Sequence, residues 1–281
     1  RNLAPLQVDF NNGVMSMKKN VLIIFLLLIG INNTVIAAAC TVTSGVTTFP
    51  TGTSCKAEPD FFQLKVYDMM LCSAAPTAPT TAAAMVLTNC QSVLTSSGGA
   101  NVSVTNGGSS TISGTITRPD NGTYTHGYIR ISSNFVIGDS RQYNTSLDED
   151  SDGDADGVYC ATTASGVDCD SSAVTAVNQT MGMGSTQFGS DYLIEDEVVS
   201  GGLVDAWLVD TNQKLEADTD GDVTYLVGVQ AFTTPLVVSD STSSMNASFA
   251  VSTGMTVIHN GGNPPILSLT NGPFSVIMTI N

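Results

Sequence analysis

The chain has 281 residues, of which 25 are acidic and nine are basic, so its formal net charge is −16 at neutral pH. Such a strongly negative surface repels nucleic acid and anionic lipid, and neither is expected as a main partner. The same charge favours solubility and the binding of divalent cations.

Residues 17–39 have the layout of a bacterial secretory signal peptide. Two lysines follow Met17, an apolar run covers residues 21–31, and small residues precede Cys40. The apolar run is too short to persist as a membrane-spanning helix. The sequence therefore predicts cleavage near Ala37 to Ala39, no transmembrane span in the mature chain, and a secreted or cell-surface protein, either periplasmic or extracellular.

Two further expectations concern the same region. Because Met17 is the natural start of the signal, residues 1–16 are interpreted as a non-native N-terminal extension. Processing as a lipoprotein at Cys40 is the alternative to ordinary cleavage, although it leaves an odd number of cysteines. Without residues 1–39, six basic and 24 acidic residues remain, a net charge of about −18.

The remaining chain favours strands and turns, because it is rich in Thr, Ser, Val, Gly and Asn and poor in Lys, Glu and Leu. In chain order, strands are expected at residues 61–71, 101–105, 111–117, 123–131, 133–137, 203–209, 223–232, 236–238, 247–252, 255–259, 266–269 and 274–280. A Pro/Thr/Ala-rich loop is expected at residues 73–84, and residues 82–90 are the one place where a short helix is allowed.

Short strands separated by turn residues predict an all-β protein, built as an antiparallel β-sandwich of the Ig-like or jelly-roll-like kind. The acidic, Gly-rich stretch at residues 147–184 interrupts this rhythm. It is interpreted as a long insertion or as the boundary between two β lobes. Residues 40–146 then form a sandwich lobe, and residues 185–281 either complete that sandwich or form a second lobe.

All six cysteines follow the leader, and an even number in an exported chain predicts three disulfides. Six cysteines allow fifteen pairings, which sequence alone does not distinguish. The sequential arrangement, with each bridge closing a short loop, is our expectation. It pairs Cys40 with Cys55, Cys72 with Cys90, and Cys160 with Cys169.

The most specific local signal is an acidic run that resembles the first half of an EF-hand calcium loop. Alternating carboxylates on a tight loop direct their oxygens to one point, and Gly permits the sharp turn. The bidentate Glu of an EF-hand is absent, because Tyr159 or Thr163 stands there. We expect Ca²⁺ to bind with ligands also drawn from elsewhere, the alternative being a solvated acidic loop. The expected ligands are Asp148, Asp150, Asp152, Asp154 and Asp156.

A shorter acidic run at residues 216–222 offers Asp218, Asp220 and Asp222 as a second, weaker calcium site. A plain β-turn is the more economical interpretation, because Asp and Gly suit such turns.

Enzyme signatures are sparse. No Gly-x-Ser-x-Gly, phosphate loop or dinucleotide fingerprint occurs, and the chain has only two histidines and one tryptophan. His126 is expected as an exposed or paired strand residue and His259 as a strand-end residue. Tyr124, just inside a strand after Gly122, is expected to bury its ring and cap a loop with its hydroxyl.

These features favour an exported, non-enzymatic structural or cell-surface protein: a filament or pilus-like subunit, a surface-layer component or an adhesin. Its partners would be further copies of itself, other surface proteins or glycans. The first alternative is a secreted Ca²⁺-dependent module that binds glycans or another envelope component. A secreted hydrolase with a carboxylate site is the second alternative.

Overall fold

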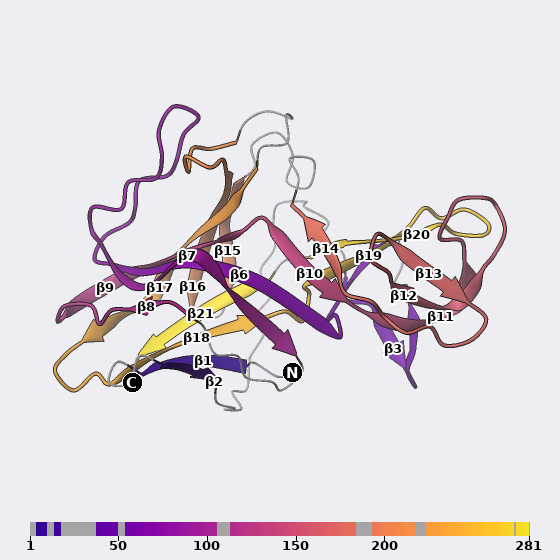
Figure 1. The fold of residues 1–281 in the computed structure, drawn as a ribbon, viewed down its shortest axis with the longest axis horizontal. Coiled ribbons are helices and arrows are strands. Elements are labelled where there is room, and N and C mark those ends of the chain that lie inside the picture. The colour runs from indigo at the N-terminus through magenta and orange to yellow at the C-terminus, as the bar shows by residue number, and fades with distance from the viewer. Residues whose placement is uncertain are drawn as a thin grey trace.

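The computed structural model describes residues 4–9, 14–17, 38–49, 54–105, 113–183, 193–199, 201–216, 223–272 and 274–280. These residues form an all-β protein in which mainly antiparallel sheets pack together, as the sequence predicted (Figure 1). No helix occurs among them. The short helix allowed at residues 82–90 was therefore wrong, because this segment forms turns and bridges instead.

The largest sheet is nine-stranded and has the order β14-β10-β6-β9-β17-β16-β15; in addition, β7 pairs with β6, and β8 pairs with β7. Its strands are β6 (Phe61–Cys72), β7 (Cys90–Thr105), β8 (Thr115–Ile116), β9 (Gly122–Ser132), β10 (Asn134–Gly138), β14 (Gln179–Gly182), β15 (Leu193–Val199), β16 (Gly202–Val209) and β17 (Tyr225–Val238). Along the first half of β6, buried residues alternate with half-buried ones, the period that places every second side chain on the core face.

Three smaller sheets accompany it. The four-stranded one has the order β2 (Val14–Met17), β1 (Ala4–Asp9), β18 (Ser244–Ala250) and β21 (Ser275–Ile280). The five-stranded one has the order β13 (Val167–Asp170), β12 (Gly157–Thr162), β11 (Ser140–Leu147), β4 (Val46–Thr48) and β3 (Thr41–Thr43). The three-stranded one has the order β20 (Leu267–Asn271), β19 (Met255–His259) and β5 (Ser54–Ala57). The five- and three-stranded sheets form a narrower lobe, and the other two form a wider lobe (Figure 1).

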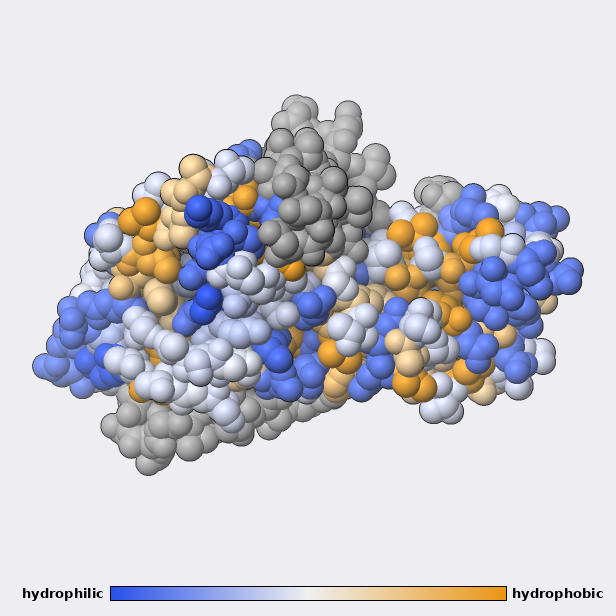
Figure 2. Space-filling model, turned by 45° about the horizontal axis from the view of Figure 1, so that its top comes forward, coloured by the Kyte–Doolittle hydropathy of each residue, from blue (hydrophilic) through white to orange (hydrophobic). Residues whose placement is uncertain are grey.

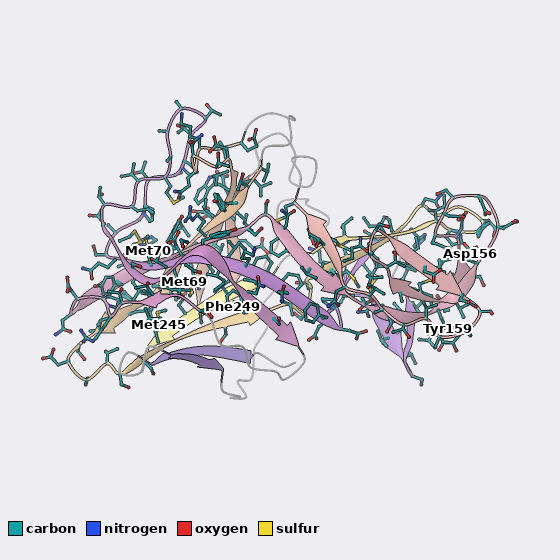
Figure 3. All side chains as sticks on the ribbon, in the orientation of Figure 1. Met69, Met70, Asp156, Tyr159, Met245 and Phe249 are labelled. Atoms are coloured by element: carbon teal, nitrogen blue, oxygen red, sulfur yellow. A yellow bond between two sulfur atoms is a disulfide. The ribbon has the colours of Figure 1, made fainter. Side chains whose placement is uncertain are left out.

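One continuous hydrophobic core runs through both lobes. In the wider lobe it includes Met69, Met245 and Phe249, which the nine-stranded and four-stranded sheets enclose between them (Figure 3). A second, smaller core lies on the opposite face of the nine-stranded sheet and contains the only tryptophan, Trp207, together with Cys72. Met85 covers this second core from the loop that precedes β7, so both faces of the sheet are buried there.

Several strands extend beyond their predicted bounds. The two strands expected at residues 223–232 and 236–238 form one strand, β17, which begins at Tyr225 and whose pairing with β9 shifts register between Ala231 and Leu236. The acidic stretch at residues 147–184 contains three strands, β12, β13 and β14. Residues 4–9 and 14–17, which belong to the expected extension and the start of the signal peptide, form β1 and β2. The expected strand at residues 111–117 is described only from residue 113, where β8 is short.

The three disulfides are Cys40–Cys55, Cys72–Cys90 and Cys160–Cys169, the sequential pairing that we expected. Disulfides of this number are typical of an oxidising or extracellular compartment. Across the described ranges, no helix has the length and apolar character that a membrane crossing needs. The apolar run of the expected signal peptide, residues 21–31, lies outside those ranges.

Tyr124 has the expected role at the start of β9. Its ring is buried, and its hydroxyl donates a hydrogen bond of 2.8 Å to the carbonyl oxygen of Asp120. The turn before β9 is thereby tied to the strand, as in many β-sandwiches.

Candidate metal centre

The acidic loop joins β11 to β12 at the outer end of the narrower lobe, where Figure 2 shows a concentration of hydrophilic residues. Backbone hydrogen bonds close its base, since the amide of Asp156 donates to Leu147 over 3.0 Å. Asp148 also bonds through its backbone to Pro265 and Leu267, at 3.0 and 2.8 Å. Where the loop enters β12, Gly157 lies so close to the backbone of Asp170 that a side chain there would collide with it. Both ends of the loop therefore pack against the sheet.

Asp148 organises the turn with its side chain. Its carboxylate is buried and accepts hydrogen bonds from the amides of Ser151 and Gly153, at 2.6 and 3.2 Å. Both of these residues have positive φ, 68° and 97°. Gly153 adopts that conformation without steric cost, which explains a glycine at this point of the acidic run.

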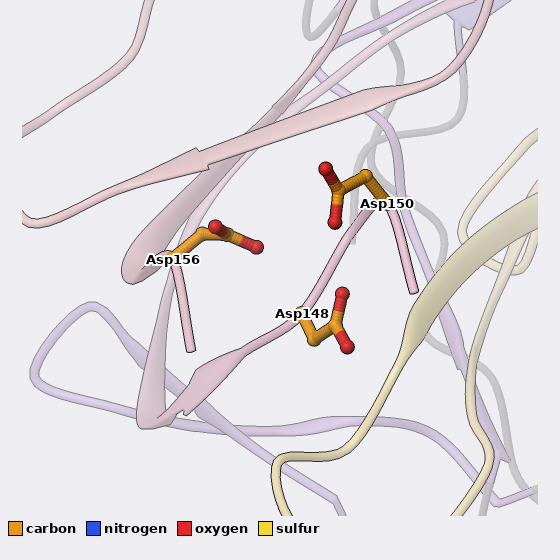
Figure 4. A group of neighbouring side chains, drawn as sticks. All are labelled: Asp148, Asp150 and Asp156. Carbon is orange, nitrogen blue, oxygen red and sulfur yellow. The ribbon is translucent and has the colours of Figure 1, made fainter. Parts of the chain in front are cut away.

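Three carboxylates converge inside the loop: those of Asp148, Asp150 and Asp156 (Figure 4). One oxygen from each lies within 4.8 Å of the others. Oxygens that ligate one Ca²⁺ at roughly 2.3–2.6 Å lie up to about 5 Å apart, so this spacing fits a shared calcium ion. Asp148 is buried, Asp156 half-buried and Asp150 exposed, so an ion here is open to water on one side.

The charges in this loop favour a cation. Burial is the main cause that raises the pKa of Glu149 to about 7, and its hydrogen bond with Asp156 raises it further. That same hydrogen bond lowers the pKa of Asp156. The two carboxylates lie so close together that the ionised pair is unfavourable and tends to hold a proton, and a divalent cation can take the place of that proton.

The structure brings together three of the five predicted ligands. Asp148, Asp150 and Asp156 occupy positions 1, 3 and 9 when the EF-hand-like loop is counted from Asp148. Asp152 and Asp154 are exposed and fall outside the three-carboxylate group. Each contributes to the turn instead, because Asp150 accepts from the amide of Asp152 at 3.1 Å and Asp152 from that of Asp154 at 2.8 Å. The weaker predicted site, Asp218, Asp220 and Asp222, lies outside the described residues.

Both histidines make local contacts in the described structure. His126 shares a hydrogen bond of 2.8 Å with the hydroxyl of Thr125, and burial lowers its pKa. His259 accepts a hydrogen bond from the amide of Gly261 and packs its ring edge against Phe49. Both contacts fit the strand-residue roles expected from the sequence.

A buried ion pair that the sequence analysis missed connects the two lobes. Asp139, between β10 and β11, receives two hydrogen bonds from the guanidinium of Arg141, at 2.6 and 2.8 Å. Arg141 also donates to the carbonyl of Glu58, and Asp60 accepts from the amide of Ser140 at 3.0 Å. A polar hollow of about 290 Å³ lies beside the pair. The two residues are only two positions apart, and what the sequence did not indicate is their burial where β10 passes into β11.

Stability is expected to fall as the pH rises through the pKa of Asp139. Burial raises this pKa to about 6 although Arg141 opposes the shift, whereas an unfolded Asp titrates near 3.9. A raised folded-state pKa contributes stability that is complete below about pH 4 and is lost as the pH passes 6. The contribution is about 2–3 kcal/mol. Urea unfolding of the wild type and of Asp139→Asn between these pH values measures it, and a pH-independent difference between the two would contradict it.

The fold and the site together define an all-β, disulfide-stabilised protein with a candidate divalent-metal centre in one loop. No family model matches the chain, and no curated protein sequence or solved structure matches it either.

Proposed function

We propose that this chain is an exported, non-enzymatic structural or cell-surface protein, stabilised by its disulfides and by Ca²⁺. The observation that carries the proposal is the combination of three short-range disulfides with a carboxylate cluster in an otherwise all-β framework. Covalent bridges and calcium sites both limit unfolding in extracellular conditions, where no reductant or chaperone maintains the fold. A filament or pilus-like subunit, a surface-layer component or an adhesin fits these properties.

Export through the signal at residues 17–39 is part of the proposal. It is supported by the disulfides, because three bridges in one chain are rare in a reducing cytosol. The disulfide of Cys40 favours ordinary cleavage near Ala37 to Ala39 over lipoprotein processing, since lipid attachment requires the same sulfur.

The position of Trp207 favours a structural role over glycan binding. Aromatic platforms for sugars must be exposed, and the only tryptophan is buried in the second core among Val227, Val229 and Tyr128. The glycan-binding module therefore ranks below the structural protein.

Calcium is expected to raise the free energy of unfolding by about 1–2 kcal/mol at millimolar concentration, given the weak affinity usual for extracellular sites. Thermal melts with Ca²⁺ and with chelator measure the effect. Asp150→Asn/Asp156→Asn should abolish it, because this double variant removes two of the three converging carboxylates.

Asp152→Asn/Asp154→Asn is the matched control. It removes the same charge from the same loop but leaves the three-carboxylate group intact, so the calcium response should remain. Equal loss of the response in both double variants would show that Ca²⁺ only screens the acidic loop. A wild-type melting temperature that is the same with Ca²⁺ and with chelator would refute the metal centre.

A further inference from the structure

Strand β18 has two neighbours in the structure, β21 on one side and β1 on the other (Figure 1). β1 pairs antiparallel with β18 along its whole length, from Ala4 opposite Phe249 to Asp9 opposite Ser244. β1 precedes the expected cleavage near Ala37 to Ala39, and the exported chain therefore lacks it. In that form β18 becomes an edge strand.

This edge lacks the features that normally prevent strands from pairing between molecules. Natural edge strands are protected by charges, proline or bulges. β18 contains neither a charged residue nor proline, and its pairing with β1 shows no register shift. Edge strand β15, in contrast, exposes Glu195, Asp196 and Glu197. Met245, Ala247 and Phe249 remain anchored in the core, so β18 is held in an extended conformation that another strand can join.

The charge distribution indicates what joins it. Residues 241–281 contain no Asp, Glu, Lys or Arg, whereas the exported chain as a whole carries a net charge of about −18. Two copies of such a protein repel each other over most of their surfaces. The sheet formed by β18 and β21 lies entirely within the uncharged segment, so two copies can approach there without placing like charges in contact.

We propose that β18 of the exported protein pairs antiparallel with β18 of a second copy and forms a two-fold dimer through a continuous sheet. The proposal rests on the export proposed above. The register with β1 shows that this edge accepts an antiparallel strand. Antiparallel pairing of two identical strands is self-complementary and closes after two copies. β21 lies close to β17 of the nine-stranded sheet, which leaves β18 as the open edge.

The test uses the full chain expressed with its leader in a bacterial cell. Mass spectrometry of the product shows whether the leader is removed, and light scattering during size-exclusion chromatography gives the oligomeric state over a wide concentration range. We expect a processed dimer. Retention of the leader would refute export. The edge would then be tested on a variant that carries a protease site after Ala39 and is cut there after purification. Processing with a monomer at every concentration would refute the dimer alone.

Charge variants locate the interface. Ser248 is half-buried between the core residues Ala247 and Phe249 and points away from the core. Ser248→Lys and Ser248→Glu should each be monomeric, because like charges meet across the two strands. An equal mixture of the two should recover the dimer.

Ser268→Lys is the matched control, because it places the same charge at an exposed position on a different edge strand, β20. This control should remain dimeric. A dimer that survives Ser248→Lys, or a ladder of larger species in place of a closed dimer, would overturn the proposal.

Discussion

Replacing Arg141 by Met is expected to lower the free energy of unfolding by about 3–5 kcal/mol at pH 7, the usual loss when one member of a buried ion pair is removed. Asp139 would remain buried without its cation and near the carboxylate of Asp60. The carbonyl of Glu58 would also lose its donor. Urea denaturation with a free fit of the slope measures the loss.

The double variant Asp139→Asn/Arg141→Met separates charge burial from packing. It removes both charges, and because a neutral pair leaves no buried carboxylate, most of the lost stability should return. Acidification should also restore part of the stability of Arg141→Met, since a protonated Asp139 needs no cation. A loss below about 1 kcal/mol in the single variant would place this interaction with ordinary surface ion pairs.

Removal of the Cys72–Cys90 disulfide, by replacing both cysteines with Ala, is expected to cost about 3 kcal/mol. The bridge joins β6 to β7 and closes a loop with a sequence separation of 18. Part of this loop covers the second core through Met85. A longer free loop in the unfolded chain raises its entropy, which destabilises the folded state. Chemical denaturation of the oxidised variant measures the cost.

Removal of Cys160–Cys169 is the matched comparison, because it also deletes one short-range bridge but lies in the narrower lobe. Its sequence separation is 9, and halving the loop reduces the expected cost by about 0.6 kcal/mol. The fluorescence of Trp207 adds a local test. Its emission should shift to longer wavelength only in the Cys72/Cys90 variant, because Trp207 and Cys72 share the second core. An identical shift in both variants would indicate general loosening of the fold.

A calcium site and a dimer edge would act on different parts of the exported protein. The three carboxylates are at the outer end of the narrower lobe, whereas β18 belongs to the wider lobe. Calcium is therefore expected to stabilise each copy without changing its oligomeric state. In a surface protein, the stability of each subunit would then depend on calcium, whereas assembly of the subunits would not.

The sequence by itself determined the features that depend on local chemistry. β-branched and small polar residues favour strands wherever they recur, so the all-β class follows from composition. Each disulfide closes a loop of fewer than twenty residues, and the sequential pairing has the smallest entropic cost of closure. The role of Tyr124 was predictable for the same reason, since its partner Asp120 is four residues away.

The tertiary structure alone decided the features that depend on how the chain turns and on what it buries. In the alternating pattern of the acidic run, all five aspartates are equivalent. The folded turn brings Asp148, Asp150 and Asp156 together and leaves the other two, Asp152 and Asp154, exposed outside the group. The pair of Asp139 and Arg141 depends on burial at a junction between two lobes, which local periodicity does not report. The order of strands in each sheet is likewise set by long-range pairing and burial. Many strands have similar local preferences, so the local sequence does not say which of them pair.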